Sequence, residues 1–112
     1  MTLMHDNPAI LSYILHKNLE IDIEKLKCYA SVGVDEIELT ECFSGGELIS
    51  GSHFQKFVFP YTKKLIEKMR KRKIKVIYWF EGDVNLRLDM IKKLGVDALA
   101  VEDSKKYGDR YR

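Results

Sequence analysis

Hydrophobic and polar positions recur along the chain with two different periods, which predict three helices and three strands. Apolar residues recur at helical spacing in three segments, 8–33, 50–71 and 83–94. Short apolar or alternating runs typical of strands occupy 34–40, 74–80 and 98–101. Because helices and strands follow one another in turn, the pattern predicts an α/β fold with a parallel sheet.

The clearest part of this pattern is the stretch 74–103, IKVIYWFEGDVNLRLDMIKKLGVDALAVED. We expect Gly82 to break the first strand and Asp83 to cap the helix that follows, and we expect Gly95 to end that helix. Two apolar strands joined by one helix form a βαβ unit, with parallel strands and a right-handed crossover. In parallel sheets the ligand chemistry lies beyond the carboxyl ends of the strands. We therefore place Glu81, Asp83 and Glu102 at a candidate site.

The strand 34–40 has one apolar and one acidic face. Ile37 and Leu39 alternate with Glu36 and Glu38, and a period of two puts the two kinds on opposite faces. An acidic face is unusual for a parallel strand that is covered on both sides. Either this face points into a barrel, where polar residues line a cavity, or the strand lies at an edge and faces water.

The two longer helices carry start signals and possible interruptions. Asp6 or Asn7 followed by Pro8 is a helix start, and Asn18 interrupts the apolar stripe that follows, so the segment is one bent helix or two. Ser50 or Ser52 is expected to cap the second helix. Pro60 cannot donate a helical hydrogen bond, so we expect a kink or a restart there.

Other polar features favour ordinary explanations. Gly45-Gly46 follows a strand and can in principle cradle a phosphate, but no phosphate-binding motif surrounds it, so we favour a plain loop. We take His5 and His16 as surface histidines. The two cysteines lack the paired spacing of a zinc site and are expected to be free thiols.

The composition restricts the class of protein but does not indicate a function. The chain has 112 residues, 46% of them hydrophobic and 32% charged, which fits a single soluble globular domain. It has no apolar run long enough to span a membrane and no signal peptide, so we expect a cytoplasmic protein without a membrane partner.

One segment, Lys63–Lys75, is strongly basic, with eight Lys and Arg against the single acid Glu67. Such a cluster suits a nucleic acid or an anionic membrane. It also suits the negative end of a helix dipole. No aromatic residues interleave with the charges as stacking platforms, so we favour the helix end and do not expect nucleic-acid binding.

Several stretches, in order, resemble the uroporphyrinogen decarboxylase superfamily, which includes the decarboxylases and cobalamin-dependent methyltransferases on a (β/α)8 barrel. GVDEIELTECFSGGELIS resembles the family's fifth strand and loop, and FQKFVFPYTKKLIEKMRKRKIKVI resembles the next helix and strand, with Pro60-Tyr61 in place. GVDALAVED resembles the strand after that, and KKYGDR resembles the approach to the last one. The resemblance covers nearly the whole chain.

The resemblance implies a partial TIM barrel: one domain, 1–112, with about three of the eight βα units, and therefore a chain that is inactive alone. The family's substrate-gripping arginines and aspartate lie in its other half. The methyltransferases hold zinc with His-x-Cys where this chain has Trp79 and Glu81, and the decarboxylases tend to have lysine where this chain has Glu81. The resemblance therefore implies no metal and no resident cofactor, and a tetrapyrrole or corrinoid as the ligand.

From these arguments we take Glu41, Glu81 and Glu102 as candidate catalytic residues, since clustered carboxylates raise one another's pKa. The candidate substrate-binding residues are Thr40, Phe43, Trp79 and Asp83. A non-catalytic binding module is the alternative. We expect Trp79 to be at least partly buried. A three-stranded sheet also has open edges and an open face, so we expect a homo-oligomer or a complementing chain.

Overall fold

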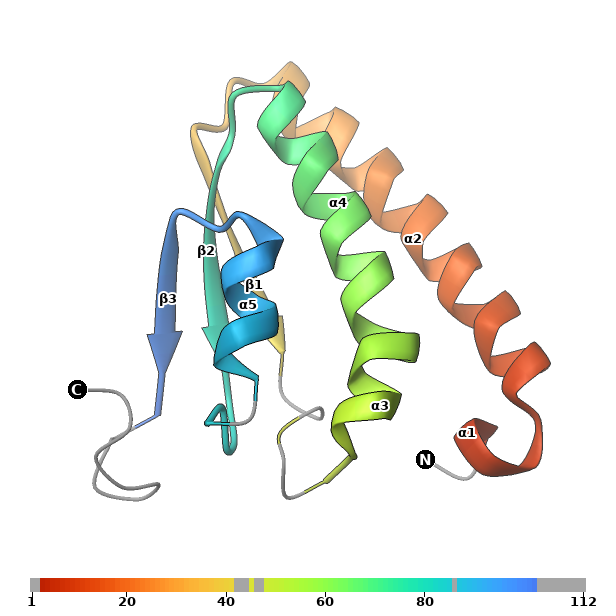
Figure 1. Cartoon of the computed structure of the whole chain (residues 1–112). Coiled ribbons are helices and arrows are strands. Elements are labelled where there is room, and N and C mark those ends of the chain that lie inside the picture. The colour runs from red at the N-terminus through yellow and green to blue at the C-terminus, as the bar shows by residue number, and fades with distance from the viewer. Residues whose placement is uncertain (1–2, 42–44, 46–47, 86, 103–112) are drawn as a thin grey trace.

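The helices and strands of the chain, seen in a computed structural model, follow the predicted alternation (Figure 1). The structure describes residues 3–41, 45, 48–85 and 87–102. The elements are α1 (Leu3–Asp6), α2 (Pro8–Ser31), β1 (Glu36–Glu41), α3 (Gly51–His53), the π-helical segment η1 (Phe54–Val58), α4 (Phe59–Lys71), β2 (Lys75–Phe80), α5 (Leu88–Leu94) and β3 (Ala98–Val101).

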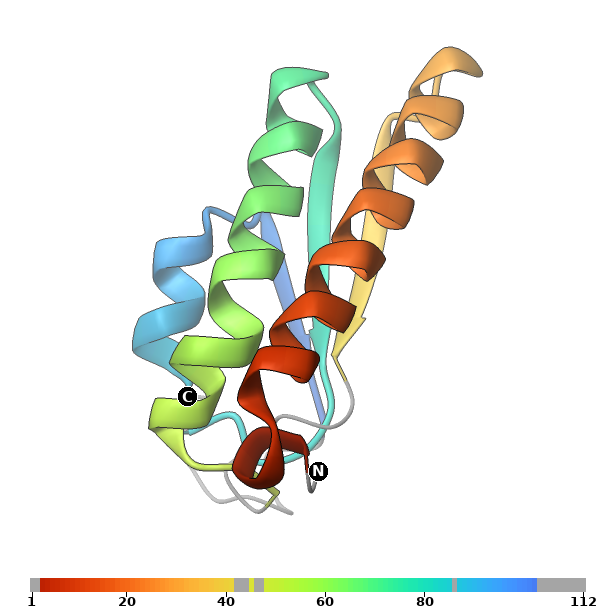
Figure 2. The same ribbon diagram turned by 90° about the vertical axis from the view of Figure 1, so that its right-hand side faces the viewer.

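The strands form one parallel sheet in the order β1-β2-β3, which confirms the α/β class. The register pairs Thr40 with Trp79 and Trp79 with Ala100. The long helices lie in one layer against one face of this sheet, as Figure 2 shows most clearly. The molecule is accordingly thin, with extents of 40 × 38 × 18 Å. No described element covers the other face, which we call the open face.

The core lies between the sheet and the helix layer. Val76, Tyr78 and Phe80 alternate along β2 and are at most 1% exposed, whereas Ile77 and Trp79 are half-buried on the open face. The core cluster also includes helical residues, among them Leu26, Phe54, Phe57, Leu65, Ile66, Met69, Ile91 and Leu94. Full burial of one such side chain contributes about 1.5–3 kcal/mol, so this single layer of contacts stabilises the fold.

Helix α2 is one continuous helix, which settles the alternative left open at Asn18. The Asn7 side chain caps it by accepting a hydrogen bond from the Ile10 backbone N–H at 3.1 Å, and Asn18 lies exposed within it. Ile10 and Ile14 belong to the apolar positions of segment 8–33, from which we expect a helix face that covers the sheet. That expectation is wrong for these two side chains, which are 48% and 39% exposed.

The expected interruption at Pro60 takes the form of a π-helical turn. Ser50 caps the segment by accepting a hydrogen bond from the His53 N–H at 3.2 Å. The Phe59 N–H then bonds the carbonyl of Phe54, five residues back rather than four. Pro60 has no N–H to give, and the wider turn that precedes it lets the helix pass through without a break.

The turn after β2 differs in part from the prediction. Gly82 has φ 95° and Gly95 ends α5 with φ 76°, and both values lie in the left-handed region that favours glycine. Asp83 does not cap the helix, because α5 begins only at Leu88. Its carboxylate instead accepts from the backbone and side-chain N–H groups of Asn85, at 3.0 and 2.8 Å.

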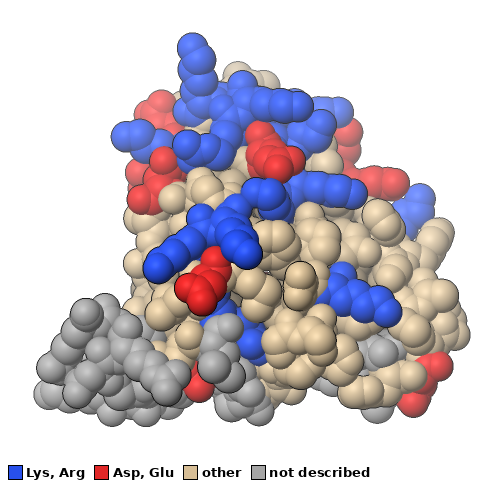
Figure 3. All heavy atoms as spheres, viewed as in Figure 1, with Lys and Arg blue, Asp and Glu red and all other residues tan. Residues whose placement is uncertain are grey.

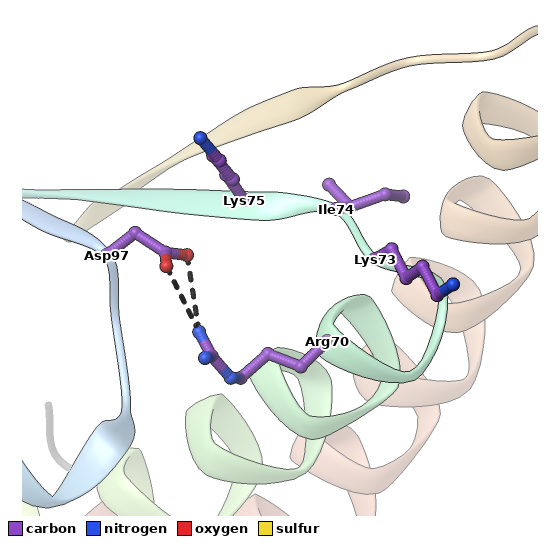
Figure 4. A pocket seen from close by; sticks show the side chains of 5 residues that line it. All are labelled: Arg70, Lys73, Ile74, Lys75 and Asp97. Atoms are coloured by element: carbon purple, nitrogen blue, oxygen red, sulfur yellow. Dashed lines mark hydrogen bonds and ion pairs between the residues drawn. The ribbon is translucent and has the colours of Figure 1, made fainter.

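The amino ends of the strands are tied together by Asp97 (Figure 4). Its carboxylate accepts from the Val76 backbone N–H at 2.8 Å and from the Arg70 guanidinium at 3.3 Å. The Val76 N–H bond, aided by the Arg70 charge, lowers the pKa of Asp97 below its usual value. Arg70 also donates to the Gly95 carbonyl, so one cation joins α4 to both ends of the turn before β3.

The basic segment Lys63–Lys75 forms the end of the molecule above these strand starts. In Figure 3, Lys and Arg gather over the carboxyl-terminal part of α4, at the end opposite the carboxyl ends of the strands. The cluster is therefore separate from the candidate site. Among the described residues, none of the helices combines the length and the apolar character needed to cross a membrane.

Candidate functional site

The carboxyl edge of the sheet brings together residues from all three strands on the open face. Thr40, Trp79 and Ala100 are neighbours in the register of β1, β2 and β3. Glu81 and Glu102 follow the ends of β2 and β3, each two residues beyond an open-face residue, and Glu81 is bonded to the open-face Trp79. We call Thr40, Trp79, Glu81 and Glu102 the acidic rim.

Within the acidic rim, Trp79 and Glu81 form a hydrogen-bonded pair. The indole N–H donates to the Glu81 carboxylate at 3.2 Å, and both side chains are half-buried. The half-buried indole confirms the prediction made for Trp79. This bond fixes the orientation of the ring on the open face.

Glu102 joins the end of β3 to the turn after β2. Its carboxylate accepts a hydrogen bond from the Gly82 backbone N–H at 3.1 Å, and the side chain is half-buried. The positive φ of Gly82 turns this N–H toward the neighbouring strand end. Glu81 follows β2 and Glu102 follows β3. Each accepts from its own donor, Trp79 for Glu81 and the Gly82 N–H for Glu102.

The structure separates Glu41 from the acidic rim. Glu41 pairs in register with Phe80, so its side chain belongs to the helix-covered face. The Tyr78 hydroxyl lies on that face, is buried, and has no hydrogen-bond partner among the described residues. Burial, with a smaller contribution from the Glu41 charge, raises the pKa of Tyr78 far above its usual value. Glu41 and Glu81 therefore do not act as one carboxylate pair.

The other predicted site residues add little evidence for a binding site. Phe43 and Gly46 lie outside the described residues. Gly45 is buried, and its carbonyl accepts from the N–H groups of Leu48 and Ile49, which is the geometry of an ordinary turn. Asp83 is satisfied locally by Asn85, as described above, and serves to shape the turn that follows Glu81.

Arg87 is a residue of this region that the sequence reasoning missed. It is 1% exposed, donates a short hydrogen bond to the Ile49 carbonyl, and stacks its guanidinium 5.0 Å from the centre of the Phe54 ring. A buried cation connects the loop after β1 to the turn after β2. The signal in the sequence was Arg87 between Leu86 and Leu88, at a position where a helical apolar stripe expects a buried residue.

The described residues do not fit a zinc site at the strand end where the methyltransferases hold one. Among residues 3–41, 45, 48–85 and 87–102, no three His, Cys, Asp or Glu side chains converge as metal ligands. The Trp79 indole donates its N–H to Glu81, and an indole N–H cannot act as a metal ligand. No step of the chemistry is therefore assigned to a metal here.

The parallel sheet, its helix layer and the polar strand ends define the class of the protein: an α/β chain with its candidate site at the carboxyl edge. The family model described as "Uroporphyrinogen decarboxylase (URO-D)" matches residues 1–112. The chain belongs to this family.

Individual relatives agree with this assignment. The chain is 29% identical over 100 residues to the uroporphyrinogen decarboxylase of Geotalea daltonii and 25% identical over 100 residues to that of Geobacter sulfurreducens. It is 25% identical over 95 residues to the methylcobamide:CoM methyltransferase MtbA of Methanosarcina mazei. These matches cover 85–89% of this chain but only 27–29% of each relative. No solved structure matches significantly.

Proposed function

We propose that this chain provides one part of a binding pocket for a cyclic tetrapyrrole, as in a uroporphyrinogen decarboxylase-like protein. The observation that carries the proposal is the acidic rim, in which the Trp79 indole is bonded to Glu81 and the Glu102 carboxylate is bonded to the residue that follows Glu81. A tetrapyrrole presents pyrrole N–H donors around an aromatic or partly aromatic ring. Carboxylates accept such N–H groups in charge-assisted hydrogen bonds, and an indole offers a surface for stacking.

In this proposal Trp79 stacks on the ligand, and Glu81 and Glu102 accept its N–H groups. Thr40 adds a hydroxyl on the neighbouring strand. Asp83 and Arg87 act through the turn that positions Glu81, Asp83 by its bonds to Asn85 and Arg87 by its bond to Ile49. Neither of these two side chains is proposed to touch the ligand.

We further propose that the 112-residue chain has no decarboxylase or methyltransferase activity when alone. Three strands do not close a barrel, so the open face stays in water and the reacting groups of a ligand are held from one side only. Catalysis needs several groups held together around a desolvated ligand. Closing the pocket requires further strands.

One observation favours a corrinoid as a second candidate ligand. The open face carries the exposed Glu36 and Glu38 in addition to the acidic rim, with Lys75 as the register partner of Glu36. Negative charges on the face repel a ligand that is itself rich in carboxylates, such as uroporphyrinogen. A corrinoid carries amide groups instead, which donate to carboxylates without repulsion. The methyltransferase relative is named for a corrinoid substrate, a methylcobamide.

Equilibrium dialysis of the purified chain against uroporphyrinogen, kept reduced, and against hydroxocobalamin tests the proposal. We expect one of the two to bind, and we expect Trp79→Ala to weaken that binding about tenfold through the loss of stacking. Lys71→Ala, at the opposite end of the molecule, is the matched control and should leave binding unchanged. Binding of neither ligand, or binding that Trp79→Ala does not weaken, would refute the proposal.

Activity assays complete the test. Incubation with uroporphyrinogen, and separately with methylcobalamin and a thiol acceptor, should give no turnover above a protein-free blank. Clear turnover in either assay would contradict the proposal that the chain is inactive alone.

A further inference from the structure

Two histidines from separate helical elements lie against each other at the surface. His5 belongs to α1 and His53 to α3, and the centres of their imidazole rings are 4.8 Å apart, with the ring planes inclined by 74°. His5 is exposed and His53 is half-buried, so solvent reaches the pair. Figure 1 shows α1 and α3 at the end of the molecule toward which the strands point. Segments that are distant in the sequence thus bring two imidazole rings side by side.

The ring nitrogens of both histidines are available as ligands. In the part of the chain that the structure describes, neither imidazole takes part in a hydrogen bond or an ion pair. The hydrogen bond from His53 to Ser50 is donated by the backbone N–H and leaves the ring out. A neutral imidazole has one unprotonated nitrogen, and imidazole is a common ligand of Zn²⁺, Cu²⁺ and Ni²⁺. The pair therefore presents two nitrogen ligands without first breaking another bond.

The spacing of the two rings fits one shared metal ion. Metal–nitrogen bonds of about 2.1 Å that meet at an angle of about 90–110° place the centres of two imidazole rings roughly 4.6–5.3 Å apart. The observed spacing of 4.8 Å lies in this range. Rotation of a histidine ring about χ2 leaves its centre almost in place, because the Cβ–Cγ bond points close to the ring centre. Turning the rings therefore changes the direction of the nitrogens and keeps the spacing that a shared metal requires.

The surroundings hold one ring in position and tolerate a cation. The His53 ring lies 6.0 Å from the ring of Phe57, which is only 4% exposed. Asp6 follows His5 in α1, and the Lys56 ammonium lies 5.2 Å from the centre of the Phe57 ring. These two charged residues have opposite signs, so a metal ion at the pair does not meet an excess of positive charge.

We propose that His5 and His53 together bind a divalent first-row transition-metal ion, of the class of Ni²⁺, Cu²⁺ and Zn²⁺, between α1 and α3. Two protein ligands leave the remaining coordination positions of the metal to water. The site is therefore open and binds more weakly than a structural zinc site with four protein ligands. Cu²⁺ should bind more tightly than Ni²⁺ or Zn²⁺, as expected for nitrogen ligands.

This site is separate from the acidic rim and from the strand end where the methyltransferases hold zinc. Among the described residues, no third His, Cys, Asp or Glu side chain converges with the pair. We therefore assign no chemical step to the metal. The consequence of binding is structural, because an ion that binds the folded chain stabilises the contact between α1 and α3. The inference does not depend on the proposed tetrapyrrole.

Calorimetric titration of the full chain with NiCl₂ tests the proposal. We expect one bound Ni²⁺ per chain, with a dissociation constant on the order of 10 µM. His5→Ala and His53→Ala should each weaken binding at least tenfold. The double variant should bind no more weakly than either single variant, because each change alone already removes the shared site.

The chain offers a matched control in His16, the third of its three histidines. His16 is exposed, and its ring lies 5.1 Å from that of Tyr61, which is a similar ring contact without a second imidazole. His16→Ala should bind Ni²⁺ like the native chain. Cys28→Ser removes an exposed thiol, which is another possible metal ligand, and should also leave binding unchanged.

Thermal unfolding followed by circular dichroism gives a second readout and shows that each variant is folded. Excess Ni²⁺ should raise the unfolding midpoint of the native chain and of His16→Ala, but not that of His5→Ala or His53→Ala. No binding of Ni²⁺ by the native chain would overturn the proposal. So would binding that only one of the two variants weakens, because the metal would then be held by a single histidine, or binding that His16→Ala abolishes.

Discussion

At each edge of the sheet, a carboxylate next to β3 accepts a hydrogen bond from a backbone N–H in or just after β2, but the residues around the two carboxylates differ. At the amino edge, the Asp97 carboxylate before β3 accepts from the Val76 N–H of β2. At the carboxyl edge, the Glu102 carboxylate after β3 accepts from the Gly82 N–H beyond β2. Asp97 is additionally paired with Arg70, in a turn surrounded by cations. Glu102 lies at the end of β3 and is bonded to the residue after Glu81, whose carboxylate accepts from the Trp79 indole.

The comparison separates a structural role from a binding role. A carboxylate that is paired with a cation and a backbone N–H is satisfied, and it fixes the start of a strand. In the proposed function, the carboxylates of the acidic rim also accept hydrogen bonds from a ligand. We therefore expect changes of the acidic rim to alter binding, whereas changes of the arginines and of Asp97, which fix the turns at the two edges, should alter stability.

The largest expected effect is on stability, and it is measured by comparing variants of Arg87 and Arg70. Arg87→Leu removes a buried cation that bonds the Ile49 carbonyl and stacks on Phe54, and it should lower the free energy of unfolding by about 2–4 kcal/mol. Arg70→Leu breaks an exposed ion pair with Asp97 and a hydrogen bond to the Gly95 carbonyl, and it should lower the free energy of unfolding by clearly less. Urea unfolding followed by circular dichroism measures both, and equal losses would contradict the ranking.

A smaller effect concerns the pH dependence of stability. The pKa of Asp97 is lowered in the folded state, so its contribution is complete above the ordinary value of 3.8 and is lost as pH falls below it. Asp97→Asn keeps an oxygen acceptor for the Val76 N–H and removes the charge. Its unfolding free energy should fall less steeply below about pH 4 than that of the native chain.

Glu67→Gln, an exposed change on α4, provides the control and should keep the native slope. If the slope in acid were the same for the native chain and for Asp97→Asn, the Asp97 contact would not be the source of the acid sensitivity.

The smallest effect is spectroscopic and local to the acidic rim. Trp79 is the only tryptophan in the chain, so its fluorescence reports on this site alone. Glu81→Ala removes the acceptor of the indole N–H and should shift the emission maximum, whereas Glu81→Gln retains an acceptor oxygen and should shift it less. Identical spectra for the native chain and Glu81→Ala would mean that the bond does not form in solution. An emission maximum typical of a fully exposed indole would contradict the half-buried position of Trp79.

Local patterns in the sequence were enough to predict the main helices and strands and the parallel direction of the strands. The run of β-branched and aromatic residues in β2 and the stop at Gly95 were interpreted correctly, because both depend on neighbouring residues only. The sequence was also sufficient to predict on which face of the sheet Glu41 lies. Counting from Ile37 and Leu39 by twos puts Glu41 on the helix-covered face, away from Glu38 and Thr40.

Features that depend on distant contacts could not be predicted. Apolar residues surround α2 on two sides, so the sequence alone does not tell which side faces the core; the packing of α2 against α4 decides that Leu19 and Leu26 are buried. The position of Arg87 in an apolar stripe indicates a buried side chain, but its partner, the Ile49 carbonyl, lies across the loop and cannot be identified from the sequence. Helix α5 begins at Leu88 and not directly after Asp83, because the Asp83 carboxylate accepts from Asn85 instead of capping a helix.

The central claim is that the carboxyl edge binds the ligand and the amino edge does not. Titration of the 15N-labelled chain with uroporphyrinogen or hydroxocobalamin, followed in 15N–1H correlation spectra, tests it most directly. The single indole N–H signal of Trp79 and the backbone signal of Gly82 should shift, while those of Val76 and Lys73 stay in place. Shifts at Val76 and Lys73 without shifts at Trp79 and Gly82, or no shifts with either ligand, would contradict the claim.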